Sequence, residues 1–228
     1  MSPVTAIAVT MVEAVETGSM EFKPDQALIV IDVQNDFCPG GSLAVPGGDE
    51  IVAGINRLAP EFPVRVFTQD WHPDGHSSFA SRHDGKAPFE TTELSYGTQV
   101  LWPDHCVQGS DGAEFHPELD TGIADIIIRK GFRRAIDSYS AFFENDRETT
   151  TGLDGYLRSR NVDSIACVGL ATDFCVCYSA VDAARLGYSV TVYEDGCRAI
   201  DLDGSLAAAR AEMQRSGVRL VSWPALPG

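Results

Sequence analysis

The heptapeptide Gly169–Cys175 (GLATDFC) constrains the fold more than any other stretch of the chain. It follows a short apolar run typical of a buried strand, and it precedes residues 176–186, whose apolar side chains recur at helical spacing. Thr172 or Asp173 is predicted to cap this helix, which places Cys175 in its first turn. The helix dipole there favours a thiolate, so Cys175 is a candidate nucleophile; a buried structural cysteine is the alternative.

Apolar runs of strand length alternate with helical patterns along the chain. The strands are expected at residues 27–33, 64–68, 124–129, 164–168, 189–193 and 219–222, and the helices at 51–58, 153–160, 176–186 and 203–216. This alternation predicts an α/β fold with a mainly parallel sheet. Residues 25–228 are expected to form one domain. Residues 1–24 are weakly patterned and are expected to be an extension, either a short helix or disordered.

Three reactive side chains lie at or just after the carboxyl ends of apolar strands. They are Asp32, Lys130 and Cys175. An acid in a buried strand is costly unless it is paired, so Asp32 either has a chemical role or binds backbone N–H groups of the next loop. Lys130 alone would be read as a solvated strand end. In an open parallel sheet, however, the carboxyl edge carries the ligand-binding crevice, and all three residues are expected at that edge.

A second group of residues has the chemistry of metal ligands. If the chain is extended at Asp70-Trp71-His72, the acid and the imidazole project to the same side, and together they suit Zn²⁺, Fe²⁺ or Mn²⁺. Residues 73–118 form a long segment with little periodicity, a feature of functional loops. It contains His105 as a candidate third ligand. Spacing does not choose between His105 and the other histidines of this segment, which are His76, His83 and His116.

Composition excludes several classes of protein. The 228 residues carry a net charge of −16, which argues against nucleic acid or an anionic membrane as a partner. No apolar run approaches the roughly 20 residues that span a bilayer, and the first ten residues do not read as a secretory signal. The six cysteines form neither a Cys-x-x-Cys motif nor a short-spaced framework, so reduced thiols and a cytoplasmic location are expected.

From Ala27 onward the chain closely resembles the nicotinamidases of the isochorismatase-like cysteine hydrolase family. The segments that carry the resemblance are, in order, IDVQNDFCPGGSLAVPGG, TQDWHPDGHSSFAS, LWPDHCVQGSDGAEFHP, RKGF, DSYSAFF and GLATDFCV. Six such segments in the same order are far more specific than any one of them. The resemblance implies an open, mainly parallel six-stranded sheet with helices on both faces, in agreement with the pattern of strands and helices.

The resemblance also implies a set of site residues. The catalytic triad falls on Asp32, Lys130 and Cys175, and the metal ligands fall on Asp70, His72 and His105, with His76 or Ser78 left open as an additional ligand. The backbone N–H groups of Ala171 and Cys175 would stabilise an oxyanion, and the Leu170–Ala171 peptide would be cis. The aromatic walls of the pocket fall on Phe37, Trp102 and Tyr139.

The implied reaction is hydrolysis of nicotinamide to nicotinate and ammonia through a cysteine thioester, as part of NAD salvage. One divalent ion, Zn²⁺ before Fe²⁺ or Mn²⁺, would orient the pyridine ring, and pyrazinamide is an analogue to test as a substrate. A homo-oligomer is left open. The alternatives are another amidase, a vinyl-ether hydrolase of the same fold, which needs neither Cys175 nor the metal set, and a non-catalytic metal or thiol-redox protein.

Overall fold

The computed structural model describes residues 23–223, so most of the expected 1–24 extension lies outside the described residues. Six parallel strands form one sheet in the order β5-β2-β1-β6-β7-β8, as predicted. The strands are β1 (Gln26–Ile31), β2 (Val64–Asp70), β5 (Ile126–Lys130), β6 (Ser164–Leu170), β7 (Ser189–Arg198) and β8 (Arg219–Val221). Strands β1 and β6 are central and buried on both faces, which explains why each is a continuous run of apolar residues in the sequence.

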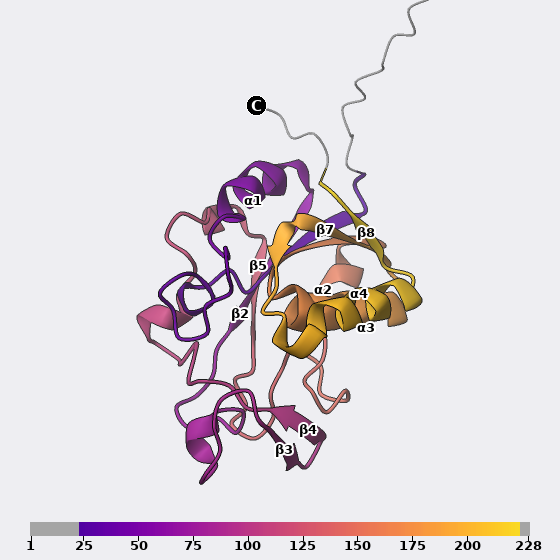
Figure 1. The fold of residues 1–228 in the computed structure, drawn as a ribbon. Helices are drawn as coiled ribbons and strands as arrows, with labels where there is room; N and C mark the ends of the chain where they lie inside the picture. Colours follow the sequence, from indigo (N-terminus) through magenta and orange to yellow (C-terminus); the bar gives the residue numbers. More distant parts are fainter. Residues whose placement is uncertain (1–22, 224–228) are drawn as a thin grey trace, which may run out of the picture.

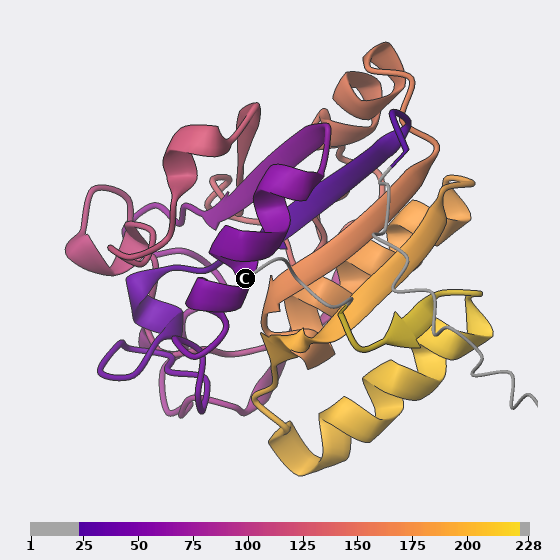
Figure 2. The same ribbon diagram turned by 90° about the horizontal axis from the view of Figure 1, so that it is seen from above.

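Helices pack on both faces of this sheet (Figures 1 and 2). Helix α1 (Val52–Leu58) lies on one face, and α3 (Cys177–Arg185) and α4 (Ser205–Arg215) lie side by side on the other. Helix α2 (Leu153–Ser159) precedes β6. All four helices begin and end within about two residues of the bounds that the apolar spacing predicts.

The strand order changes direction between β1 and β6. From β1 the chain runs outward through β2 to β5, and it then returns to β6 on the other side of β1. The loops that leave β1 and β6 therefore diverge, and ligands bind at such a switch point in open α/β sheets. Asp32 directly follows β1, and Cys175 lies five residues after β6 ends at Leu170. The topology alone thus brings these two residues to the same edge of the sheet, after the ends of two neighbouring strands.

The long segment after β2 covers this edge of the sheet. It contains a two-stranded antiparallel hairpin, β3 (Thr91–Leu94) and β4 (Gly97–Val100), at the bottom of Figure 1. The sequence did not predict this hairpin, because each strand is four residues long and contains a single large apolar residue, Leu94 or Val100, so no period of apolar side chains reveals it.

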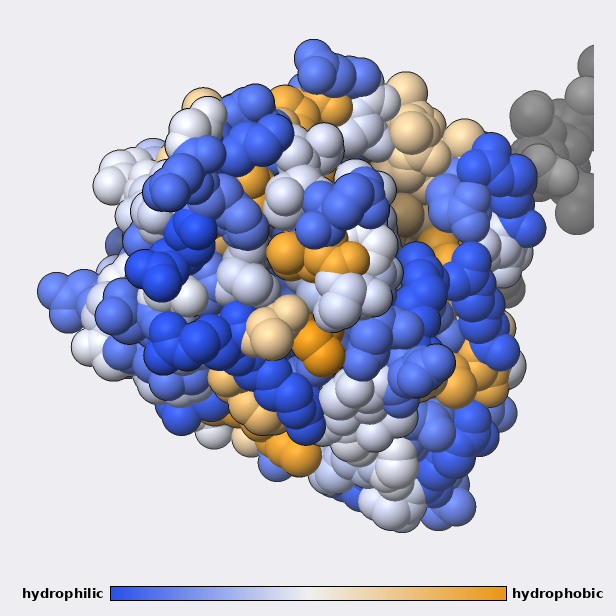
Figure 3. Space-filling view, turned by 90° about the horizontal axis from the view of Figure 1, so that it is seen from below, coloured by the Kyte–Doolittle hydropathy of each residue, from blue (hydrophilic) through white to orange (hydrophobic). Residues whose placement is uncertain are grey.

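A space-filling view shows how polar one face of the molecule is. The face in Figure 3 is largely hydrophilic, with apolar residues in small separate patches. Within the described part of the chain, no helix has the length and apolar character needed to cross a membrane.

Candidate active site

Asp32 is completely buried immediately after β1. Its backbone has a φ of 49°, in the left-handed region, where the chain leaves the strand. Oδ1 accepts a hydrogen bond of 2.6 Å from the Thr68 hydroxyl, and Oδ2 lies 2.8 Å from Lys130 Nζ. The carboxyl group thus contacts Thr68, Lys130 and the thiol of Cys175, and within residues 23–223 it accepts no hydrogen bond from a loop N–H group. The alternative role considered for Asp32, anchoring the next loop, is therefore not seen.

Lys130 is the cation that joins the parts of the site. It ends β5, two strands away from β1, and its side chain is fully buried. Its Nζ lies 2.8 Å from Asp32, 2.5 Å from Asp70 and 3.4 Å from Cys175 Sγ, and it also donates to the carbonyl oxygen of Ser138. These anionic neighbours raise the pKa of Lys130 well above its usual value in spite of burial. Lys130 is therefore a permanent cation between two carboxylates and a thiol.

Cys175 lies in a π-helical turn, Thr172–Val176, that leads into α3. The residue is 6% exposed, and ligand atoms of Asp32, Asp70 and Cys175 lie within 4.8 Å of one another. Burial raises the pKa of this thiol well above its usual value, because it outweighs the opposing effect of Lys130. Burial therefore opposes the helix dipole, which was expected to favour a thiolate at Cys175. A base is needed to remove the proton, and Asp32 is the adjacent group, with its pKa raised by burial to about 6.

The nucleophile turn is held differently from the sequence prediction. Ala171 occupies the N-cap position, and neither Thr172 nor Asp173 caps the helix. Instead, the Asp173 carboxylate accepts hydrogen bonds from the backbone N–H groups of Ile200 and Asp201 and from the Ser205 hydroxyl. Asp173 therefore fastens the turn to the loop between β7 and α4. The Leu170–Ala171 peptide is cis, as expected.

Asp70, His72 and His105 converge beside the triad, with ligand atoms all within 4.8 Å of one another. Asp70 Oδ2 lies 3.7 Å from His72 Nε2 and 4.0 Å from His105 Nε2. The other ring nitrogen of each histidine lies against a backbone carbonyl, Gly131 for His72 and Pro103 for His105. Such contacts fix the tautomer that leaves Nε2 free to bind a metal. The three side chains are buried, and this donor set fits a divalent ion such as Zn²⁺.

His76 and Ser78, which the sequence left open as ligands, contact one another. The Nδ1 of His76 lies 2.8 Å from the Ser78 hydroxyl, and its Nε2 lies 3.0 and 3.1 Å from the carbonyl oxygens of Arg133 and Ile136. The ring of His76 lies 4.4 Å from that of His72. Both nitrogens of His76 are thus engaged by protein groups, whereas each of the other two histidines has one nitrogen facing Asp70.

Aromatic side chains surround the reactive groups. The Phe37 ring lies 5.5 Å from that of His105, and the Trp102 indole donates a hydrogen bond of 3.1 Å to the Tyr139 hydroxyl. Phe174, which the sequence analysis did not single out, packs edge-on against Trp102 at 4.8 Å. Its position directly before Cys175 was the available signal. These rings give the site flat apolar walls of the kind that enclose a planar ligand.

Residues 26–225 match the family model described as the isochorismatase domain. The chain belongs to the isochorismatase family. A nicotinamidase from Acinetobacter baylyi is 58% identical over 196 residues, covering 86% of this chain and 92% of that protein.

Solved structures of this family are also similar to the chain. A nicotinamidase/pyrazinamidase from Acinetobacter baumanii superposes with a TM-score of 0.87 at 56% identity, covering 88% of this chain and 97% of that one. An L. infantum protein in complex with nicotinate superposes with a TM-score of 0.77 at 40% identity, covering 89% of this chain and 96% of that one. A pyrazinamidase of Pyrococcus horikoshii in complex with zinc superposes with a TM-score of 0.71 at 34% identity, covering 88% of this chain and 100% of that one. The observed fold is the fold of these enzymes.

Proposed function

We propose that the protein hydrolyses nicotinamide to nicotinate and ammonia. The observation that carries this proposal is the junction of two sets of groups at one sheet edge. A buried thiol, acid and lysine lie beside a converging Asp-His-His set, and Asp70 belongs to both because it contacts Lys130 and the two histidines. The reactions named for the similar nicotinamidases, and the nicotinate bound to one of the similar structures, support the same substrate.

In this mechanism Asp32 takes the proton from Cys175 Sγ, and the sulfur attacks the amide carbon. The backbone N–H groups of Ala171 and Cys175 stabilise the resulting oxyanion, at about 3–4 kcal/mol for one well-placed donor. Asp32 returns the proton to the departing nitrogen as the carbon–nitrogen bond breaks, which releases ammonia and leaves a thioester. Asp32 then takes a proton from water, which attacks the thioester and frees nicotinate and the thiol. Lys130 holds Asp32 in place throughout.

Asp70, His72 and His105 would hold one divalent ion, and the zinc-bound pyrazinamidase supports Zn²⁺, with Fe²⁺ or Mn²⁺ as alternatives. When bound, the ion supplies a coordination position for the pyridine nitrogen of the substrate. Phe37, Trp102 and Tyr139 would pack against the ring and exclude water. Positioning of this kind lowers the activation barrier by several kcal/mol, because binding has already removed the translational and rotational freedom of the reacting groups.

The setting of the reaction follows from the same proposal. The substrate is a small molecule, and the reaction belongs to NAD salvage in the cytoplasm. All six cysteines are free and buried, which suits a reducing compartment.

The test is ammonia release by the purified, reduced, zinc-loaded protein given nicotinamide. Rapid release with equimolar nicotinate is the expected result. No release from nicotinamide, together with release from another small amide in a panel that includes pyrazinamide, would assign the same machinery to a different amidase. A vinyl-ether hydrolase is disfavoured because that chemistry has no use for the convergent thiol and metal ligands.

A further inference from the structure

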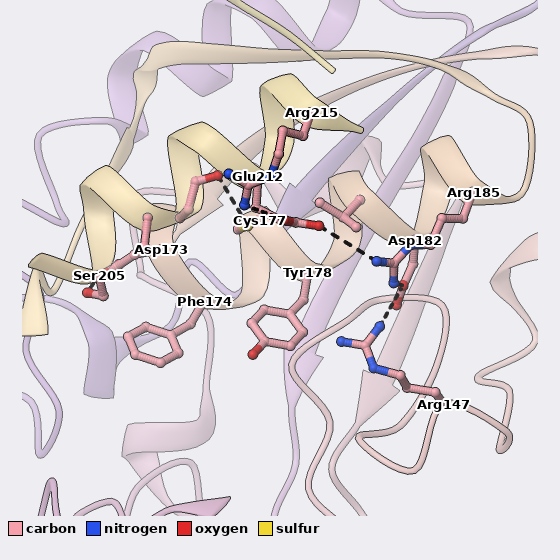
Figure 4. Close-up of a pocket in the computed structure, with 13 residues that line it drawn as sticks. Arg147, Asp173, Phe174, Cys177, Tyr178, Asp182, Arg185, Ser205, Glu212 and Arg215 are labelled. Atoms are coloured by element: carbon pink, nitrogen blue, oxygen red, sulfur yellow. Dashed lines mark hydrogen bonds and ion pairs between the residues drawn. The ribbon is translucent and has the colours of Figure 1, made fainter. Parts of the chain in front are cut away.

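A cavity lies beside the nucleophile turn, between α3 and α4 (Figure 4). Its volume is about 430 Å³, within the range of small-molecule pockets. No member of the proposed triad or metal set lines it. Val181 on α3, together with Ala208 and Ala209 on α4, contributes apolar surface, and the rings of Phe174 and Tyr178 form one side. The cavity therefore offers flat apolar contacts outside the catalytic site.

Three arginines and three acids line the same cavity, and two of the acids, Asp182 and Glu212, make the ion pairs with the arginines. Arg147 and Arg185 both approach the same oxygen, Oδ1 of Asp182, at 3.5 Å. Arg185 also lies 3.7 Å from Glu212, whose other oxygen is 2.6 Å from Arg215. These three guanidinium groups thus face two carboxylates.

Asp173 is the third acid of the lining, and its oxygens are already occupied. They accept hydrogen bonds from Ile200, Asp201 and Ser205. Within residues 23–223, the guanidinium groups of Arg147 and Arg185 make only these long ion pairs and a stacking contact of Arg147 on Tyr178. Their N–H donors remain available, and the planar fork of an arginine matches a carboxylate.

We infer that this cavity is a binding site for a small aromatic carboxylate. The ring would lie against Phe174 and Tyr178, and the carboxylate would meet Arg147 and Arg185. A neutral apolar molecule would leave those donors unused, and a cation would meet the guanidinium groups. This assignment concerns binding only and is independent of the reaction proposed above.

The position of the cavity connects it to the catalytic groups. Phe174 and Tyr178 flank Cys175 in the chain, and their far sides pack against the active-site walls, Phe174 on Trp102 at 4.8 Å and Tyr178 on Tyr139 at 5.1 Å. A ligand that presses on these two rings acts on the turn that carries the nucleophile. Occupancy is therefore expected to lower kcat more than it changes KM, a consequence that rests on the proposed function.

The experiment is a calorimetric titration with benzoate, which has the ring and the carboxylate but no pyridine nitrogen. Ala208→Trp fills the cavity from an exposed position on α4, and Ala207→Trp is its matched control because Ala207 is exposed on the same helix but does not line the cavity. We expect Ala208→Trp and Arg185→Gln to weaken benzoate binding at least tenfold. Ala207→Trp and Arg158→Gln, an exposed arginine outside the cavity, should bind as the unmodified protein does.

Equal benzoate affinity in Ala208→Trp and Ala207→Trp, or no binding at millimolar benzoate, would overturn the site. Binding that is lost in Ala208→Trp but unchanged in Arg185→Gln would overturn the carboxylate assignment. A chain that binds benzoate in this pattern and does not hydrolyse nicotinamide would refute the proposed function while keeping the site. Inhibition of turnover by benzoate that persists in Ala208→Trp would place the inhibitory molecule in the catalytic site and contradict the coupling.

Discussion

Lys130 Nζ and Asp32 Oδ2 lie 2.8 Å apart, and neither side chain has any solvent exposure. The pair joins the ends of two strands, β5 and β1, that are separated in the sheet by β2. The same amine reaches Asp70 at the end of the intervening strand. One buried cation thus neutralises the carboxylates at the ends of the next two strands of the sheet, β2 and β1, and its removal would leave both acids enclosed without a counter-charge.

Replacement Lys130→Met should destabilise the fold as well as abolish activity. Removing one partner of a buried ion pair costs about 3–5 kcal/mol, because the remaining charge stays desolvated. Chemical denaturation should therefore show a large loss in the free energy of unfolding. Arg65→Met is the comparison, since its pair with Asp125 is about one-quarter exposed and should be worth at most about 1 kcal/mol. Equal losses in the two variants would contradict the importance given to the enclosed pair.

Much of the fold is predictable because its signals are local. Each central strand is a continuous apolar run, and each helix has apolar side chains at helical spacing. Burial therefore produces a regular spacing of apolar residues that can be recognised in the sequence. The hairpin at residues 91–100 escapes this reasoning because it is stabilised by pairing on an exposed surface. The role of Asp173 escapes it too, because a capping residue and a residue that binds a loop 27 positions later look the same in sequence.

The candidate site also contains residues that the sequence indicates and residues that it does not. Strand ends alone indicate that Asp32, Lys130 and Cys175 share an edge, since parallel strands finish together. Spacing could not choose His105 from the other histidines, and only the resemblance did so. Thr68 was not anticipated, although its hydroxyl holds Asp32, because a threonine in a buried strand usually has no chemical role. The sequence also could not show whether burial or Lys130 has the larger effect on the pKa of the Cys175 thiol, because that depends on three-dimensional distances.

Cys175→Ala should abolish nicotinamide hydrolysis while the protein still binds metal and nicotinate. The reason is that the variant removes the attacking sulfur and leaves Asp70, His72 and His105 unchanged. Cys177→Ala is the matched control, because Cys177 is also buried near the start of α3 but its thiol contacts the Ala209 carbonyl instead of the triad. Ammonia release and mass spectrometry of trapped thioester would be measured. Substantial turnover in Cys175→Ala would remove this residue as the nucleophile.

Zinc content should depend on the histidines unequally. His72→Ala and His105→Ala each remove a nitrogen that faces Asp70, so both variants should lose bound metal and bind substrate more weakly. His76→Ala should retain metal, because both nitrogens of His76 already contact Ser78 and two backbone carbonyls. Elemental analysis after dialysis gives the answer. Metal loss in His76→Ala equal to that in His72→Ala would make His76 a ligand.

Asp173→Asn should slow turnover by loosening the nucleophile turn. An amide keeps the shape but has one acceptor oxygen, whereas the carboxylate serves three donors. Hydrogen bonds to a charged group are worth about 1.5–3 kcal/mol each, so a loss of stability of that order should accompany the effect on kcat. Asp154→Asn serves as the control, because this carboxylate also accepts hydrogen bonds, from Arg158 and Tyr188, but is partly exposed. An unchanged kcat together with lower stability would limit Asp173 to a structural role.

The activity should decline as the pH falls through about 6. Burial raises the pKa of Asp32 from its usual range to about 6, and the proposed base accepts a proton only when it is ionised. Below that pH the carboxyl group is protonated, so kcat/KM should decrease about tenfold per pH unit. The profile should be recorded at saturating zinc, with metal content followed over the same range to separate protonation of Asp32 from loss of the ion. Full activity maintained to pH 4.5 would show that Asp32 does not act as the base in this form, since a neutral carboxyl cannot take the proton of Cys175.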